Sequence, residues 1–414
     1  MAGRRPGTSA LLGALCALVV VLGLWNVRHY PPGHGYDAAD HIAYADGLVP
    51  DGHLPHGTGE YYTPPGYYAI AGTLDWVARK AGAGEPHRAA TVFNVLLLLG
   101  TTLLVFSLAR ELWPGRDRLA LGAAAFVALV PVTVKTEAMF HPETLSLFLS
   151  TLALWLCART FGDRRYALAL GATLGAAQLV RAFALWTVAA VCIALLVGRR
   201  WRELAVVVAL AGLIALPWYL HQRSEYGGSP VFNRPTVEKP LWKRRPVAFY
   251  VDPGLPDVVT APWRPHFLNR ALPTTYTELW GDYFGIWAWQ GRVADLPRGD
   301  ARRELQLQSV VGLAPTALAV AGWLMFLLAS LRSPPRLAAA LLPALGILGF
   351  LFFTVSYPTK DGDVLKATYM LSTAAGWALG FGYALERLRG LAWLVAAGVL
   401  TACAVAQLPF LLYG

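Results

Sequence analysis

The sequence predicts an all-α polytopic membrane protein, with about eleven transmembrane helices and short interfacial helices in its first external loop. Of its 414 residues, 56% are hydrophobic and only 14% are charged, whereas an ordinary soluble domain carries about a quarter charged residues. Its mean hydropathy is +0.46. The apolar residues also gather in runs that approach the ~20 residues needed to cross a bilayer.

Eleven such runs are candidate spans. They cover residues 9–27, 89–109, 118–134, 143–158, 166–180, 182–198, 203–220, 309–331, 337–355, 368–385 and 391–412. The stretch 166–198 is too long for one helix at 1.5 Å per residue, so we divide it at "QLVR" beside Arg181; one tilted helix is the alternative. The run 9–27 follows two arginines and precedes no small-x-small cleavage site, so we expect an uncleaved signal anchor.

The charge pattern predicts the orientation. The net charge is +10, and the arginines lie mainly in short loops between alternate spans, as expected of cytoplasmic loops. Every His and Lys then falls outside, and two long external loops cover 28–88 and 221–308 of a single domain, 1–414. Basic–aromatic arrays typical of nucleic-acid binding are lacking. The cysteines Cys16, Cys157, Cys192 and Cys403 lie in apolar runs without a CxxC pair, which indicates buried hydrophobes.

The first external loop contains "GYDAADHIAYADG", residues 35–47. On a helix, Asp37 and His41 are four residues apart and share a face. An acid and an imidazole at this spacing could be a base and its partner, or two metal ligands. The alternative is a solvated loop with Asp37 as a helix N-cap. Short surface helices are expected at 37–47 and 66–80.

An aromatic segment follows, "GEYYTPPGYYAIAG" at residues 59–72. Tyr62 and Tyr67 flank two prolines that stiffen the approach to the second surface helix. Their rings could stack on a sugar or an isoprenoid. An aromatic belt at the membrane interface is the alternative.

Ionisable residues also mark the outer ends of later spans. His141 and Glu143 lie in "KTEAMFHPETLSLFL", where Glu143 opens a span; the helix dipole favours an acid there, but ionisable groups at this depth are usually functional. Arg181 would suit a phosphate, unless it only reaches toward lipid headgroups. Lys360, Lys366 and Tyr369 lie in "YPTKDGDVLKATYML", where a cation could also bind a lipid phosphate. Asp282 lies in the aromatic segment 276–289, "YTELWGDYFGIWAW", which we expect to cover the cavity.

The order of these segments resembles the GT-C superfamily of membrane glycosyltransferases, specifically its ArnT/protein-mannosyltransferase-like (RgtA/B/C/D-like) group. That group has an acid in the first external loop and then a "PPLYY" element, similar to "DAADHIAYADG" and "TPPGYYAIAG" here. Glu143 stands where the group usually has Asp, and Arg181 in "GAAQLVRAFA" stands at its Lys position. The segments "PWYLHQRSEYGGSPVF" and "KATYMLS" resemble two later elements, the second of which contains Lys366.

The resemblance implies an inverting glycosyltransferase with a GT-C fold. It would move a sugar from polyprenyl phosphate to an external lipid, glycan or protein at the outer face of the plasma membrane. Residues and resemblance together assign catalysis to Asp37 and Glu143, and substrate binding to His41, Tyr62, Tyr67, His141, Arg181, Asp282, Lys360, Lys366 and Tyr369. A divalent metal ion, if used, would be held by Asp37, His41 and Glu143. The rival function is a transporter or lipid flippase, which needs ionisable groups or broken helices near the midplane of several spans.

Overall fold

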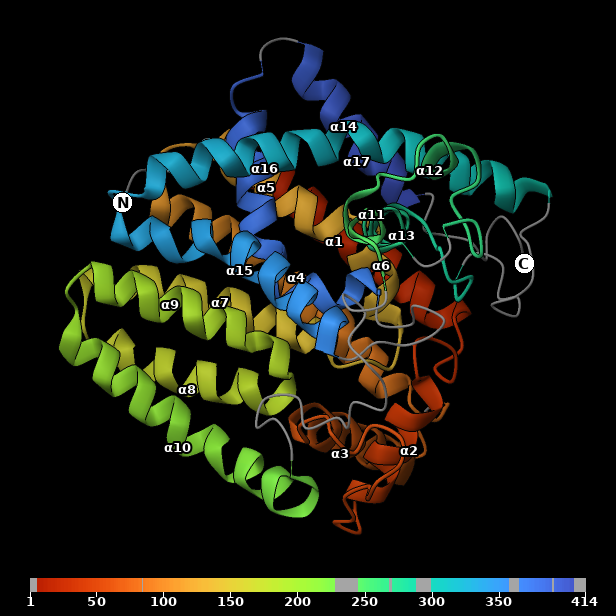
Figure 1. Cartoon of the computed structure of the whole chain (residues 1–414), viewed down its shortest axis with the longest axis vertical. Helices are drawn as coiled ribbons and strands as arrows, with labels where there is room; N and C mark the ends of the chain where they lie inside the picture. Colours follow the sequence, from red (N-terminus) through yellow and green to blue (C-terminus); the bar gives the residue numbers. More distant parts are fainter. Residues whose placement is uncertain are drawn as a thin grey trace.

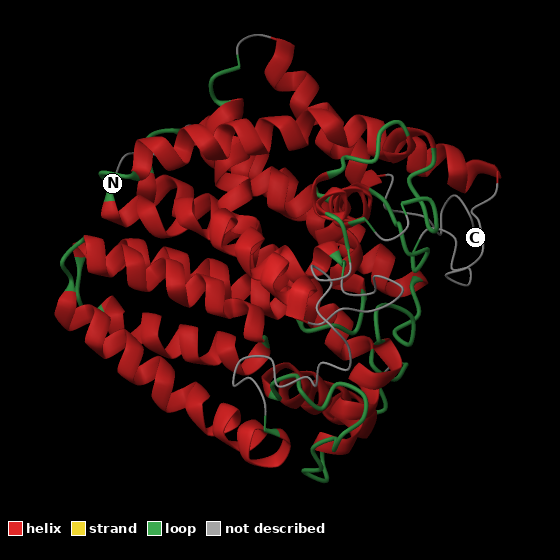
Figure 2. Ribbon diagram, viewed as in Figure 1, coloured by secondary structure: helices red, strands yellow, loops and turns green. Residues whose placement is uncertain are grey.

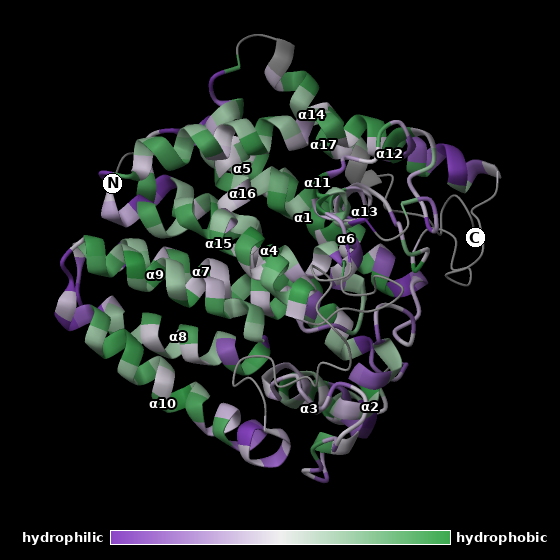
Figure 3. Ribbon diagram, viewed as in Figure 1, coloured by the Kyte–Doolittle hydropathy of each residue, from purple (hydrophilic) through white to green (hydrophobic). Residues whose placement is uncertain are grey.

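The computed structural model describes residues 6–83, 85–227, 245–267, 270–287, 299–356, 365–388 and 391–405. Every regular element within these ranges is a helix (Figures 1 and 2). The predicted all-α class is therefore confirmed. The ribbon of the long helices is mainly hydrophobic along its middle and more hydrophilic toward its ends (Figure 3), as expected of a multi-pass membrane protein.

Six helices are long and apolar enough to cross a membrane. They are α1 (Pro6–His29), α4 (Arg88–Leu112), α7 (Glu143–Gly162), α10 (Trp201–Tyr226), α14 (Gly299–Ser330) and α15 (Pro334–Ser356). A bent pair, α5 (Asp117–Leu129) and α6 (Pro131–Ala138), raises this to seven. The remaining predicted spans are shorter or broken helices: α8 (Tyr166–Val180), α9 (Leu185–Val197), α16 (Ala374–Leu385) and α17 (Leu391–Val405). The described helices therefore do not establish the count of about eleven.

The predicted span 118–134 is bent rather than straight. Its two helices, α5 and α6, meet at an angle of 50° beside Pro131. Proline lacks the N–H that would continue the ladder of α5, but it is well suited to the first position of a new helix. The second helix, α6, carries the chain on to the turn that precedes Glu143.

The division of residues 166–198 at Arg181 is confirmed. Helix α8 covers Tyr166–Val180, and a single 3₁₀ turn, η1 (Ala182–Ala184), leads into α9 (Leu185–Val197). Arg181 between them has an extended backbone, with φ −153° and ψ 132°. The segment is therefore two helices, and Arg181 lies at the break.

The arginine-rich short loops come together at one end of the helices. Arg159 Nη1 donates to Glu111 Oε2 at 3.2 Å, and Arg336 Nε donates to the Leu112 carbonyl at 3.1 Å. Arg200 Nη2 donates to the Phe161 carbonyl in the last turn of α7 at 2.7 Å, and Arg116 pairs with Glu386. The loops that the positive-inside rule assigns to one side are therefore neighbours in space.

The opposite end carries the short helices and long connections, on the right of Figure 2. They include α2 (Ala38–Leu48), α3 (Gly66–Lys80), α11 (Val247–Val251), α12 (Asp257–Thr260), α13 (Ala271–Trp280) and η3 (Ala367–Thr373), which leads into α16 (Ala374–Leu385). The two short helices predicted in the first external loop are confirmed. The second loop is shorter than the predicted 221–308, because α10 extends to Tyr226 and α14 begins at Gly299.

Glycines allow two of the long elements to pack closely. A Cβ atom added at Gly322 of α14 would meet the backbone oxygen of Gly380 in α16, and one added at Gly380 would meet the backbone of Trp323. Small residues at such crossings let two helix backbones approach in a membrane. This contact fixes α16, the helix that follows η3.

Candidate active site

Asp37 stands at the entrance to α2 in the left-handed region, with φ 52° and ψ 26°. Asp is among the few non-glycine residues that adopt this conformation readily. Its carboxylate makes no capping hydrogen bond to α2; instead Oδ2 accepts one from Lys366 Nζ at 2.9 Å. Asp37 therefore occupies the N-cap position of α2, as the alternative for this acid expected, but its side chain does not cap the helix.

Lys366 comes from the far end of the sequence, immediately before η3. Its side chain is 2% exposed, whereas that of Asp37 is 37% exposed. The ammonium also lies over the rings of Tyr36 and Tyr369, 5.1 and 5.8 Å from their centroids. The pair thus joins the first external loop to η3 and leaves one side of Asp37 open to an incoming group.

The pair changes the acidity of Asp37. Burial on its own would raise the pKa of this carboxyl, but the charge and hydrogen bond of Lys366, together with smaller contributions from His41 and Arg181, outweigh it. The pKa of Asp37 is therefore lowered from its usual value. Its carboxylate is ionised near neutral pH, as a base or a ligand requires.

His41 lies one turn along α2 and faces the same cluster. Its Nδ1 is 2.7 Å from the hydroxyl of Tyr68 in α3, which fixes the ring. Its Nε2 is buried and makes no hydrogen bond in the part of the chain that the structure describes. Burial lowers the pKa of His41 to about 4, so the imidazole is neutral at physiological pH.

Glu60 is a site residue that the sequence reasoning missed. It is 5% exposed and accepts hydrogen bonds from Thr63 Oγ1 at 2.6 Å and from the Tyr62 hydroxyl at 3.1 Å. Burial would raise the pKa of Glu60, but His41 and Arg181 reverse this and lower it. The available signal was a lone acid four residues before Pro64 in an aromatic segment, which the sequence reading treated as tyrosines alone.

Arg181 and Glu143 form a buried ion pair beside Glu60. Arg181 Nε donates to Glu143 Oε1 at 2.6 Å, and Nη1 donates to Thr63 Oγ1 at 3.2 Å. The same Nη1 lies 3.8 Å from Glu60 Oε2. The break after α8 and the start of α7 therefore meet the first external loop at one point.

Arg181 also lines a small pocket, with a cavity volume of about 30 Å³. The pocket walls are Tyr62, Thr63, Pro64, Arg181, Ala182, Phe183, Phe353 and Tyr369. The guanidinium lies 5.5 Å from the Tyr369 ring and 5.8 Å from the Phe183 ring. A cation among aromatic walls suits a phosphate with an apolar or ring-shaped substituent.

His141 and Tyr67 support this end of the cluster. The backbone N–H of His141 donates to the Tyr67 hydroxyl at 3.1 Å, and Asn94 Nδ2 donates to the same oxygen at 3.3 Å. The His141 ring is buried and contacts the His41 ring edge-on, with centroids 4.7 Å apart. Tyr67 therefore anchors the turn before Glu143, and its role in substrate binding stays a prediction.

Asp282 lies in a second buried cluster. Its carboxylate accepts the backbone N–H groups of Ile286 and Trp287, at 3.2 and 2.6 Å. Lys135 Nζ lies 3.8 Å from Asp282 and 2.5 Å from Glu278 Oε1. These contacts hold the turn after α13, so substrate binding by Asp282 stays a prediction. Lys360, a predicted phosphate-binding residue, lies outside the described residues.

The described part of the aromatic segment 276–289 packs against the residues before Asp37. The Trp287 ring lies 4.3 Å from the Tyr30 ring, and the Phe284 ring contacts Tyr36 at 6.0 Å. Tyr36 is in turn covered by the Lys366 ammonium. The segment thus supports the wall of the cluster at Asp37.

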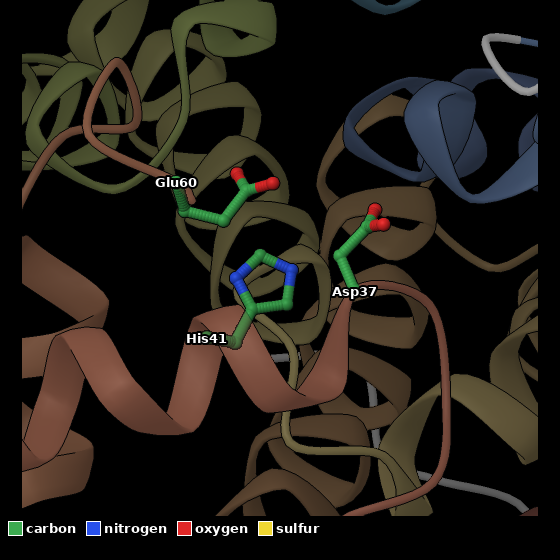
Figure 4. A group of neighbouring side chains, drawn as sticks. All are labelled: Asp37, His41 and Glu60. Carbon is green, nitrogen blue, oxygen red and sulfur yellow. The ribbon is translucent and has the colours of Figure 1, made fainter. Parts of the chain in front are cut away.

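Three ligand-type side chains meet at the centre (Figure 4). One atom each from Asp37, His41 and Glu60 lie within 4.8 Å of one another. The set predicted from the sequence had Glu143 in place of Glu60, whereas the structure pairs Glu143 with Arg181. Imidazole and carboxylate ligands suit a divalent cation such as Mn²⁺ or Zn²⁺.

The chain is similar in sequence to one known family. A family model described as dolichyl-phosphate-mannose-protein mannosyltransferase matches residues 76–220. Among curated protein sequences, no relative matches the chain. The matched segment runs from α3 to α10 and includes Glu143 and Arg181.

Two solved structures of an archaeal enzyme share the fold, and a third structure is less similar. The oligosaccharyltransferase of Archaeoglobus fulgidus in its apo form is 15% identical, with a TM-score of 0.55 over 97% of this chain and 55% of that one. The same organism's AglB in complex with an inhibitory peptide and a dolichol-phosphate is 16% identical, with a TM-score of 0.56 over 98% and 55%. ArnT from Cupriavidus metallidurans bound to undecaprenyl phosphate is 16% identical, with a TM-score of 0.44 over 93% and 79%.

This chain therefore spans about half the length of the archaeal enzyme structures. At such identity the likeness to them is one of fold. Together with the family match over residues 76–220, it supports the resemblance to the GT-C glycosyltransferases predicted from the order of the sequence segments.

Proposed function

We propose that this GT-C-type protein is an inverting glycosyltransferase that moves a sugar from a polyprenyl-phosphate donor to an external acceptor. The observation that carries the proposal is the position of Asp37. Its carboxylate is ionised, partly open and held 2.9 Å from Lys366, at the same end of the fold as Arg181 and its aromatic pocket. A base and two cations at one site match the needs of this transfer.

The transfer would be a single displacement. Asp37 accepts the proton of the acceptor hydroxyl as that oxygen bonds to the anomeric carbon of the sugar. The bond from this carbon to the phosphate oxygen breaks on the opposite side, and the lipid phosphate leaves with the electron pair. The lipid phosphate leaves readily as an anion because its conjugate acid is already a fairly strong acid. The step therefore needs positive charge near the phosphate more than it needs a general acid.

Arg181 and Lys366 would supply that charge. Arg181 lines the pocket that contains Tyr62 and Tyr369, which would contact the sugar or the first isoprenoid unit. Glu143 keeps the guanidinium in place through its 2.6 Å hydrogen bond and would act by orienting Arg181. A divalent cation bound near Asp37 would act as a Lewis acid on phosphate oxygens.

The site would face the outside of the plasma membrane. The arginine-rich loops gather at the other end of the helices, and such loops are cytoplasmic by the positive-inside rule. The similar archaeal AglB was solved in complex with a dolichol-phosphate, which is a polyprenyl phosphate like the donor proposed here. The acceptor would be a lipid, a glycan or a protein hydroxyl reached from that side.

The experiment is a transfer assay on membranes that contain the protein. Radiolabelled polyprenyl-phosphate sugars are added one at a time, and label is followed from the lipid phosphate into membrane or envelope acceptors. We expect transfer from at least one donor with the wild-type chain and none with Asp37→Asn. Equal transfer by both chains would overturn the assignment of Asp37. If donor instead crossed the membrane without release of lipid phosphate, the flippase function would replace the enzyme.

A further inference from the structure

We infer that Asp37, His41 and Glu60 form a binding site for one divalent cation of the Mn²⁺ or Zn²⁺ type. The three residues come from the start of α2, its second turn and the loop before α3. Figure 4 shows the imidazole of His41 between the two carboxyl groups. The role of the ion in catalysis rests on the proposed function. Binding of the ion does not, since it can be measured without turnover.

The distances between the three potential ligand atoms are close to those between ligands of one bound ion. One ligand atom from each residue lies within 4.8 Å of the other two. Ligands held at about 2.0–2.3 Å by one ion lie roughly 3 to 4.5 Å apart, by simple geometry from usual bond lengths. Small side-chain rotations would close the set, and neither α2 nor the loop would need to move.

An unpartnered buried nitrogen points to a ligand independently of the acidic groups. His41 Nε2 is buried without a hydrogen bond in the described chain, although His41 is only 1% exposed. Such atoms are usually satisfied by a protein group, a water or an ion. Since its Nδ1 is 2.7 Å from the Tyr68 hydroxyl, a proton on Nδ1 leaves the Nε2 lone pair free. Metal-binding histidines are typically oriented in this way by a second partner.

The local charge also favours a cation. Asp37, Glu60 and Glu143 bring three carboxylates, whereas Arg181 and Lys366 bring two positive charges. His41 lies between the carboxyl groups of Asp37 and Glu60 (Figure 4), and an imidazole that binds a metal ion does so in its neutral form and adds no charge. One negative charge therefore remains for an ion to balance.

Lys366 and the ion can share Asp37. The ammonium donates its hydrogen bond to Oδ2 of this carboxylate, and Oδ1 would coordinate the ion. Glu60 is held from the other side by Thr63 and Tyr62. An ion here would lie between Asp37 and the Arg181 pocket, where a phosphate oxygen could complete its coordination.

Direct binding measurements test the site. Protein purified in detergent is stripped with EDTA, desalted and titrated with MnCl₂, with bound Mn²⁺ followed by electron paramagnetic resonance; ZnCl₂ is titrated by calorimetry. We expect one ion per wild-type chain and a Kd at least about tenfold weaker for Glu60→Gln and His41→Ala, since even an outer-shell change costs 10–100-fold. Tyr68→Phe should weaken binding by the same outer-shell range.

Matched controls separate loss of the site from loss of the fold. Asp40→Asn removes an exposed acid of the same helix and should bind Mn²⁺ like wild type. Gel filtration and the thermal unfolding midpoint check each variant, and Mn²⁺ should raise that midpoint for wild type and not for Glu60→Gln. The inference is overturned by Kd values weaker than about 1 mM for both ions, or by binding that Glu60→Gln and His41→Ala leave unchanged. Metal binding without sugar transfer would contradict the proposed function and leave this inference standing. Sugar transfer without metal binding would overturn this inference and leave the proposed function standing.

Discussion

Arg181 and Glu143 form a buried ion pair, 2.6 Å from Nε to Oε1, that joins the break after α8 to the first turn of α7. The Glu143 side chain is fully buried and that of Arg181 is 8% exposed. Residues 38 positions apart in the sequence are thus locked together beneath the first external loop. The sequence suggested that Glu143 is a metal ligand or an acid favoured by the helix dipole. The structure instead pairs it with the guanidinium of Arg181.

This pair should contribute strongly to stability. Removal of one partner of a buried ion pair costs about 3–5 kcal/mol, because the other charge is left unpaired. Arg181→Gln and Glu143→Gln should therefore each lower the thermal unfolding midpoint in detergent by several degrees. The loss in the double variant should be smaller than the sum of the two, which a double-mutant cycle measures.

An exposed pair provides the control for this prediction. Arg79 Nη2 and Asp46 Oδ1 are 3.2 Å apart with side chains 42% and 38% exposed, and such pairs contribute about 0–1 kcal/mol. Arg79→Gln should leave the midpoint nearly unchanged. Additive losses at Arg181 and Glu143 would show that the two side chains are not coupled.

Asp37→Asn should abolish most sugar transfer while the protein still inserts and folds. The amide cannot accept the acceptor's proton, and general-base catalysis is worth about 10²–10⁴-fold. The measurement is the initial rate of label release from a polyprenyl-phosphate sugar by purified protein, with Asp40→Asn as the matched acid-to-amide control. Turnover by Asp37→Asn within a few-fold of the control would exclude Asp37 as the base.

Lys366 should set the acid side of the pH–rate profile. Burial acts to raise the pKa of Asp37 and the ammonium of Lys366 overcomes it, so Lys366→Met should raise that pKa. Activity that needs ionised Asp37 is lost as the pH falls through its pKa, so the acid limb of kcat/KM should move to higher pH. Lys366→Arg keeps the charge and should keep the wild-type limb. An acid limb at the same pH for Lys366→Met and wild type would contradict this coupling.

Local signals in the sequence were enough for most helices. Apolar runs, the two prolines before residue 66 and the lone arginine at 181 predicted α3 and the break after α8, because each depends on residues near in sequence. The 50° bend beside Pro131 was missed, since the hydropathy of that run continues through the proline. A bend of this kind depends on what packs beside the helix as much as on the proline.

The site was predicted less completely for a related reason. Asp37, Arg181 and Lys366 are charges beside apolar runs and could be singled out by their cost to the membrane. Glu60 has no such contrast, because its loop is already polar and aromatic. The pairing of acids with cations depends on contacts between residues far apart in the sequence, such as Asp37 and Lys366, which are 329 positions apart. Rules based on residue spacing within one helix or loop cannot predict such pairs.

The crossing of α14 and α16 should not tolerate a larger side chain at Gly322. A Cβ there would meet Gly380 of α16 and lie 2.8 Å from the Ala384 Cβ, and overpacking of this kind typically costs 1–3 kcal/mol or more. Gly322→Ile should lower the thermal unfolding midpoint in detergent, and because α16 follows η3, it should also reduce transfer through displacement of Lys366. Gly212→Ile in α10 is the matched control, since a Cβ at Gly212 would have no atom within 4 Å. Equal midpoints for the two variants would mean that the close crossing of α14 and α16 is not needed for the fold.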